Sequence, residues 1–157
     1  MWLDFLFRIW RSLTANIQWW LLWLINDKFM VSVSGVVVNE DGQILLQRHR
    51  HWVPDVWGFP GGIIKRGEKI EDAFARELHE ETNLVPLEIE LLRVVSGYRL
   101  RLEAYFYAKV ANRDIQKLRI QKEEVVEARF FAMDALPENI LSTQRELINV
   151  YLGKVKR

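Results

Sequence analysis

The chain of 157 residues contains no cysteine, and that absence excludes several kinds of chemistry. Without cysteine there is no disulfide, no thiol nucleophile and no cysteine-based zinc site. A chain without cysteine also fits a reducing compartment, so we expect a cytoplasmic protein. An excess of charge is absent too, because the net charge is only +1. The composition therefore gives no broad electrostatic case for nucleic acid as a partner, and we expect none.

The first 28 residues contain neither glycine nor proline, so nothing in them interrupts a helix. They lack the roughly 20-residue apolar run that crosses a bilayer, and no small-residue cleavage site of a signal peptide follows Ile25. They do contain five of the seven tryptophans of the chain. The pattern predicts one apolar, Trp-rich helix with a narrow polar stripe over residues 1–28. The tryptophans are Trp2, Trp10, Trp19, Trp20 and Trp23, and the stripe consists of Asp4, Arg8, Arg11, Ala15 and Gln18.

So many exposed apolar side chains are expected to be buried against a partner, and this N-terminal helix therefore has two interpretations. In the first, it is an interfacial helix that places the protein peripherally at a membrane surface. In the second, it packs on its own domain or forms a homodimer with a second copy. The rest of the chain, residues 29–157, has the length of one domain.

The segment from Gly62 to Leu84 carries six acidic side chains in an arrangement unlike that of an ordinary surface helix. A helix is predicted from about 69 to 83. Glu77 and Glu81 lie on or beside its apolar arc, with Glu80 next to them. Carboxylates at this spacing repel one another, and their burial is costly unless a cation compensates. Because Mg²⁺ and Mn²⁺ prefer carboxylate oxygens, the spacing predicts a divalent metal site. The apolar arc is formed by Ile70, Phe74, Leu78 and Val85.

The same segment resembles the Nudix box, G-x5-E-x7-R-E-U-x-E-E-x-G-U, in which U is a bulky aliphatic residue. Eight of the nine specified positions match, and Asn83 stands where the family has glycine. Asparagine is the residue that best replaces glycine at a helix end with positive φ, so we expect the site to survive this departure. The resemblance extends over about 29 to 153. The matching residues are Gly62, Glu68, Arg76, Glu77, Leu78, Glu80, Glu81 and Leu84.

The resemblance implies a Mg²⁺- or Mn²⁺-dependent pyrophosphohydrolase that cleaves a nucleoside diphosphate linked to another moiety. The alternative is a non-catalytic module of the same fold that binds a nucleotide or regulates. By the resemblance, Arg76 and Glu68 are orienting residues, and Glu77 or a later glutamate is the general base. The implied metal ligands are the Gly61 carbonyl, Glu77, Glu80, Glu81 and Glu124, with Glu123 and Glu127 as alternatives to Glu124.

Outside the acidic segment, β-branched and alternating stretches predict five strands, at 29–39, 43–49, 86–95, 98–110 and 123–132. Mixed strands with two or three helices indicate an α/β/α sandwich, as in Nudix proteins. The strand at 98–110 alternates so cleanly that we expect it to be half-buried. A loop is predicted at 111–122. Thr143 and Glu146 predict a capping box at the start of a last helix that ends at Gly153.

The sequence does not identify the substrate beyond its class. A basic cluster at residues 48–51 leads into the acidic segment, and it is either a solvated strand end or a set of phosphate contacts. Trp52 has two interpretations, stacking on a base and covering the core. The substrate contacts that we predict are Arg48, Trp52, Arg99 and Arg101.

Overall fold

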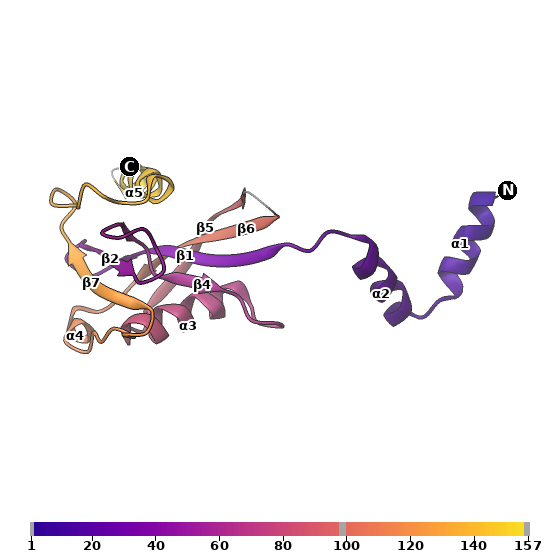
Figure 1. The fold of residues 1–157 in the computed structure, drawn as a ribbon, viewed down its shortest axis with the longest axis horizontal. Coiled ribbons are helices and arrows are strands. Elements are labelled where there is room, and N and C mark those ends of the chain that lie inside the picture. Colours follow the sequence, from indigo (N-terminus) through magenta and orange to yellow (C-terminus); the bar gives the residue numbers. More distant parts are fainter. Residues whose placement is uncertain (1, 98–99, 156–157) are drawn as a thin grey trace.

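The fold is a mixed β-sheet with a helix on each face, preceded by two short helices (Figure 1). The structure is a computed structural model that describes residues 2–97 and 100–155. Its helices are α1 (Trp2–Ser12), α2 (Ala15–Ile25), α3 (Ile70–Thr82), α4 (Asn112–Ile115) and α5 (Ser142–Val155). Its strands are β1 (Met30–Val38), β2 (Ile44–His49), β3 (Trp57–Gly58), β4 (Gly61–Ile63), β5 (Glu88–Gly97), β6 (Arg101–Lys109) and β7 (Val125–Phe131).

The sheet is organised around β1, whose β-branched residues suit a strand that is buried on both faces. Its full length pairs in parallel with β6, from Met30 opposite Arg101 to Val38 opposite Lys109. Its first half also pairs antiparallel with β4, and its end pairs antiparallel with β2. The order along the main path is β3-β2-β1-β6-β5, and β7 pairs with β2. One parallel pair in an otherwise antiparallel sheet confirms the predicted mixed sheet.

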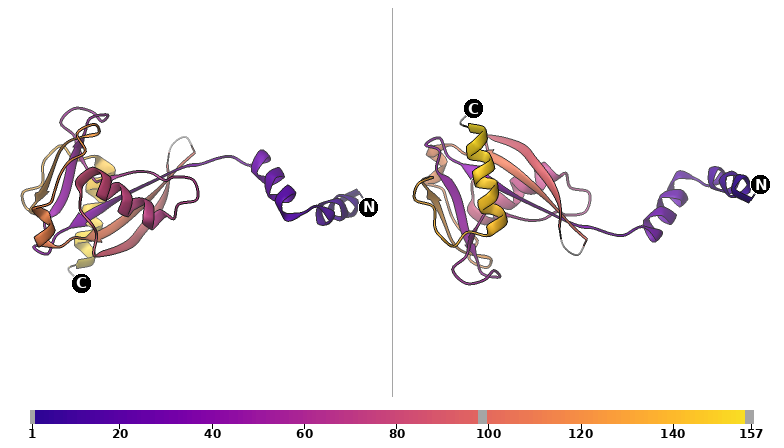
Figure 2. Two further views of the ribbon diagram at one scale, coloured as in Figure 1. Left: turned by 90° about the horizontal axis from the view of Figure 1, so that it is seen from below. Right: turned by 90° about the horizontal axis from the view of Figure 1, so that it is seen from above.

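Helices α3 and α5 cover opposite faces of this sheet (Figures 1 and 2). One core joins Phe74 and Leu78 of α3 to the side chains on one face of β1 and β6. The other core joins Leu147 and Ile148 of α5 to the opposite face, including Tyr105. The α/β/α sandwich is therefore confirmed. The prediction of a half-buried strand at 98–110 needs correction in the described residues of β6, because Tyr105 and Tyr107 pack in the core under α5 on the face that was expected to meet water.

The helix α3 begins and ends within one residue of the prediction. Asn83 follows it with φ 60° and ψ 18°, and its backbone N–H donates to the His79 carbonyl at 2.8 Å. The replacement of glycine by asparagine thus leaves the left-handed helix end intact. The prediction for Val85 was wrong: since α3 ends at Thr82, Val85 lies beyond the helix and is exposed.

The N-terminal segment forms two helices instead of the predicted single helix. Thr14 adopts an extended conformation between them, with φ −67° and ψ 152°. Side chains near the break satisfy the carbonyls that the first helix leaves open. The Ser12 hydroxyl donates to the Ile9 carbonyl at 2.7 Å, and the Gln18 amide donates to the Trp10 carbonyl at 2.7 Å.

Two further predictions near the C-terminus need correction. The short helix α4 lies within the segment 111–122 that was predicted to be a loop. The last helix begins at Ser142, because the backbone N–H groups of Gln144 and Arg145 both donate to the Leu141 carbonyl at 2.9 Å. Thr143 is therefore inside the first turn and does not start a capping box, and the helix continues past Gly153.

Candidate active site

A cavity of about 720 Å³ lies between α3, β4, the end of β2 and the start of α5. Its lining combines an acidic part with aromatic and polar side chains. The acidic part includes His49, Gly61, Gly62, Glu77, Glu80 and Glu124; the other lining residues include Trp52, Phe59, Arg101, Tyr105, Thr143 and Gln144.

Glu81 is buried at the back of this acidic part, although it is ionisable. Its side chain is only 1% exposed, and its Oε2 accepts a hydrogen bond from the Gly61 backbone N–H at 2.9 Å. Its Oε1 has no hydrogen-bond partner among the described residues. Burial in the domain raises the pKa of Glu81 to about 8, because the charged form loses its hydration there. A buried carboxylate with an open oxygen requires a proton or a cation.

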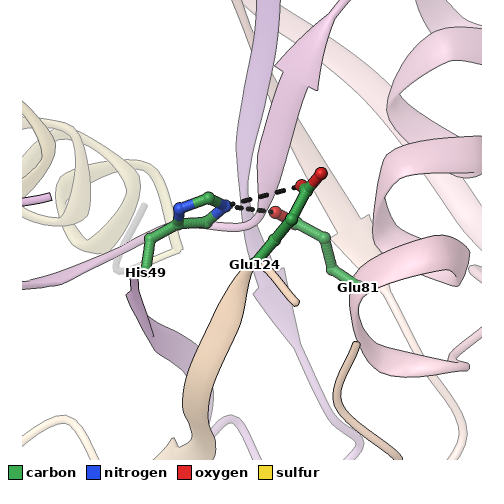
Figure 3. A group of neighbouring side chains, drawn as sticks. All are labelled: His49, Glu81 and Glu124. Carbon is green, nitrogen blue, oxygen red and sulfur yellow. Dashed lines mark ion pairs between the residues drawn. The ribbon is translucent and has the colours of Figure 1, made fainter. Parts of the chain in front are cut away.

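The open oxygen of Glu81 faces His49 and Glu124 (Figure 3). The His49 Nε2 atom lies 3.7 Å from Glu81 Oε1 and 3.7 Å from Glu124 Oε2. One ligand atom from each of the three residues lies within 4.8 Å of the others. Burial lowers the pKa of His49 despite the nearby Glu124 carboxylate, which favours the neutral imidazole that binds metals. The three side chains come from β2, from the end of α3 and from the residue before β7, and together they could hold a metal ion.

Beside this cluster, Arg76 contacts the other three glutamates of the box, Glu68, Glu77 and Glu80. Its guanidinium donates to both oxygens of Glu68, at 2.7 and 3.0 Å, to Glu77 at 2.7 Å and to Glu80 at 2.9 Å. The hydrogen bonds from Arg76 lower the pKa of Glu68 to about 2. Burial opposes a similar effect at Glu80, but hydrogen bonds from Arg76 and Lys65 outweigh it and lower the pKa of Glu80. The arginine thus fixes the positions of three carboxylates.

The two glycines of β4 allow two close approaches, Gly61 to the backbone of β1 and Gly62 to Glu77 of α3. Gly61 has φ 152°, a conformation that side-chain-bearing residues rarely adopt. At Gly62, a Cβ atom would lie 2.4 Å from the carboxyl carbon of Glu77. Any side chain there would displace the Glu77 carboxylate. The glycine pair therefore positions both the backbone at Gly61 and the carboxylates of α3.

The structure brings most of the predicted site residues to this cavity, but not Arg48. The Arg48 guanidinium is held elsewhere by Asp55 and Glu127, each at 2.6 Å, and it stacks over Trp57. Trp52 and Arg101 line the cavity, whereas Arg99 lies outside the described residues. Of the three glutamates considered for the last ligand position, Glu124 lines the cavity and Glu127 pairs with Arg48. Glu123 is exposed.

The sequence analysis missed His49 as a member of the acidic cluster. Arg48 and His49 are neighbours on a predicted strand, so their side chains should point to opposite faces. That alternation was a signal that only one of them could face the site. The pairing of β2 with β7 also shifts its register between these two residues, which re-aims the strand end.

Comparison with known proteins assigns the family. The family model of the NUDIX domain matches residues 28–151, which is most of the chain. The chain therefore belongs to the Nudix hydrolase family, as the motif predicted.

Three similar proteins illustrate the range within this family. The chain is 42% identical over 77 residues to an RNA pyrophosphohydrolase of Cellvibrio japonicus, covering 48% of this chain and 45% of that protein. It is 28% identical over 109 residues to an ADP-ribose pyrophosphatase of Methanocaldococcus jannaschii, covering 69% of this chain and 64% of that protein. The NUDIX domain of Shewanella oneidensis NrtR, solved with ADP ribose, superposes with a TM-score of 0.69 at 21% identity, covering 91% and 99% of the two chains. The chain spans less than two thirds of both curated relatives.

Proposed function

We propose that this chain is a divalent-metal-dependent pyrophosphohydrolase that cleaves a nucleoside diphosphate linked to another moiety. The observation that carries this proposal is the buried Glu81, whose open oxygen faces His49 and Glu124 at the edge of the cavity. One oxygen of this carboxylate accepts a hydrogen bond from the Gly61 backbone N–H, but the open oxygen is desolvated, and the raised pKa of about 8 favours the neutral form near pH 7 unless a cation is bound.

The donor set fits Mg²⁺ or Mn²⁺, because it consists of carboxylate oxygens and one imidazole nitrogen. Such an ion polarises phosphate oxygens and lowers the pKa of the attacking water. We assign Glu81, Glu124 and His49 as ligands from their mutual distances. Glu77, Glu80 and the Gly61 carbonyl complete the proposed set, since these three residues belong to the acidic part of the cavity lining.

Each remaining box residue has a positioning role in this proposal. Glu68 holds Arg76 through two parallel hydrogen bonds, and Arg76 in turn holds Glu77 and Glu80. A bidentate ion pair fixes the plane of the guanidinium and therefore both carboxylates. Glu77 is our proposed general base, because it lines the cavity and its neighbour Arg76 holds its carboxylate in place at 2.7 Å.

Two further lining residues, Trp52 and Arg101, supply the proposed substrate contacts. Trp52 stacks on His49 with ring centroids 5.2 Å apart, which leaves its remaining surface toward the cavity. The Arg101 guanidinium pairs with Glu103 at 2.6 Å and retains an exposed edge that can meet a phosphate. We therefore propose a nucleotide-type substrate. The expectation that nucleic acid is not a partner gains no support, since one relative is named for RNA.

The experiment that tests this function is a substrate panel with Mg²⁺ and with Mn²⁺. The panel contains nucleoside diphosphate derivatives, nucleoside triphosphates and an RNA with a 5′ phosphoanhydride. We expect metal-dependent release of a phosphorylated product from at least one of them. Glu80→Gln and Glu81→Gln should lower kcat/KM at least about 100-fold, because even groups that only support a metal ligand contribute 10–100-fold.

Glu71→Gln is the matched control, since Glu71 lies on the exposed first turn of α3 and is expected to retain full activity. No turnover of any panel member with either metal would contradict the proposal. Tight nucleotide binding without turnover would identify the non-catalytic module instead.

A further inference from the structure

The helix α2 is apolar around its whole circumference. Seven consecutive side chains from Trp19 to Ile25 are apolar, and successive side chains on a helix are rotated by about 100°. None of the residues of α2 is buried. A helix that is hydrophobic on every side is stable only when apolar material surrounds it. The most exposed of these side chains are Trp19, Trp20, Trp23 and Ile25.

The preceding helix α1 is amphipathic instead. Its polar stripe contains Arg8 and Arg11, and its apolar side exposes Trp2, Phe5 and Phe7. The two helices project from the start of β1, away from the sheet and its covering helices (Figures 1 and 2). The domain therefore does not cover them, and no residue of α1 is buried either.

Dimerisation with a second copy of the chain would not bury all the apolar side chains of α2. A helix that pairs with one partner needs one apolar stripe, and its other faces are polar so that they can meet water. Pairing would bury one side of α2 and leave tryptophan and leucine on the others. Lipid acyl chains surround a helix on all sides, so they match the side-chain distribution of α2.

The helix α2 is too short to cross a bilayer. Its eleven residues span about 16 Å, roughly half of the ~30 Å hydrocarbon core, and its continuous apolar run covers only Trp19 to Ile25. In the described part of the chain, no helix has the length and apolar character needed to cross a membrane. A short helix with polar residues at both ends can therefore lie along one leaflet without reaching the other.

Cations lie at both ends of α2. Arg8 and Arg11 precede it, and Lys28 follows it. The Lys28 ammonium donates to the Leu24 carbonyl at 3.1 Å and lies 4.7 Å from the centre of the Trp23 ring. Lysine beside tryptophan at a helix end is the pairing found at the level of lipid headgroups.

We propose that α1 and α2 form a one-leaflet membrane anchor. The helix α1 lies in the headgroup region with its arginines toward water, and α2 lies along the same leaflet among the upper parts of the acyl chains, so that both of its ends stay near the headgroups. Lys28 marks the headgroup level at which the chain leaves the lipid and enters β1. The partner is a lipid surface, and anionic headgroups strengthen the attachment. This inference does not depend on the hydrolase activity.

The test is co-sedimentation of the full chain with vesicles of phosphatidylcholine alone and of phosphatidylcholine with phosphatidylglycerol. We expect the chain to pellet with both. Anionic lipid should strengthen binding about fivefold for each cation that reaches the headgroups. The double variant Trp19→Glu, Leu22→Glu should bind at least about 100-fold more weakly, because charges are strongly disfavoured in the hydrocarbon core.

The double variant Val85→Glu, Leu87→Glu is the matched control, since it places the same charges on exposed apolar positions of the domain. It should pellet as the unaltered chain does. Equal pelleting of the α2 variant and the control would overturn the proposal. A second result would also overturn the proposal. In it, the unaltered chain stays in the supernatant, light scattering shows that it is a dimer, and only the α2 variant is monomeric. Quenching of tryptophan fluorescence by lipids brominated at mid-chain supports insertion, and its absence contradicts it.

Discussion

The helices α2 and α3 have similar lengths, 11 and 13 residues, but depart from the usual distribution of side chains in opposite ways. Helix α3 buries a carboxylate, Glu81, at the level of its core residues. Helix α2 exposes tryptophan and leucine on all sides. Each departure costs free energy in the isolated chain, through desolvation of a charge in α3 and through hydration of apolar surface in α2. Both helices therefore point to a partner outside the chain, a cation for α3 and lipid for α2.

The largest expected effect in this comparison concerns the metal-free stability of the domain. The raised pKa of Glu81 means that the folded state holds a proton that the unfolded chain releases near pH 4.5. The contribution of Glu81 to stability is therefore fully present below pH 4.5 and is lost as pH rises through about 8. The loss amounts to about 5 kcal/mol, at about 1.4 kcal/mol for each pH unit between the two pKa values.

Glu81→Gln should remove this pH dependence. Its amide carbonyl can still accept the hydrogen bond from Gly61. With a chelator present, the variant should match the unaltered domain near pH 5 and exceed its stability by several kcal/mol near pH 9. Denaturant titrations across this pH range measure the difference, and Glu71→Gln serves as the control. If the free energy of unfolding changed with pH equally in the unaltered chain, Glu81→Gln and Glu71→Gln, Glu81 would not be a desolvated carboxylate in the folded state.

The next effect concerns the choice of metal. Imidazole suits transition metals, whereas Mg²⁺ prefers oxygen ligands. His49→Gln should therefore weaken Mn²⁺ binding by at least the 10–100-fold typical of groups that support a ligand, and Mg²⁺ binding by less. Calorimetric titration with each metal measures both affinities. His51→Gln is the matched control, because His51 is an exposed neighbour whose ring centroid lies 5.6 Å from that of His49. An unchanged affinity for Mn²⁺ would exclude His49 as a ligand, and equal losses for both metals would exclude a role of His49 in the choice of metal.

The sequence predicted α3 better than the regions around it, because its information is local. The 3.6-residue period of Ile70, Phe74 and Leu78 sets its buried face. The helix end follows from the tolerance of Asn83 for positive φ, which needs no knowledge of the tertiary structure. The box spacing likewise placed Glu77, Glu80 and Glu81 on one surface, and their proximity to the cavity follows directly.

The features that the sequence did not predict depend on contacts between distant segments. His49 joins Glu81 and Glu124 only because β2 pairs with β7 while α3 packs across the sheet. Tyr105 is buried because α5 covers its face of β6, and no period within β6 could indicate that. Arg48 does not line the cavity, because Glu127 lies opposite it on β7 and the two side chains pair.

The smallest expected effect tests whether α2 belongs to the domain core. Leu22→Glu should change the free energy of unfolding of the domain by less than about 0.5 kcal/mol, since no residue of α2 is buried. Leu78→Ala in α3 is the contrasting variant, and it should cost about 2–5 kcal/mol because Leu78 is fully buried. Denaturant unfolding followed by far-UV circular dichroism measures both without lipid. If Leu22→Glu lowered the free energy of unfolding by more than about 1 kcal/mol, α2 would pack on the domain in solution. Both helices would then contribute to the domain core, and they would differ only in how much.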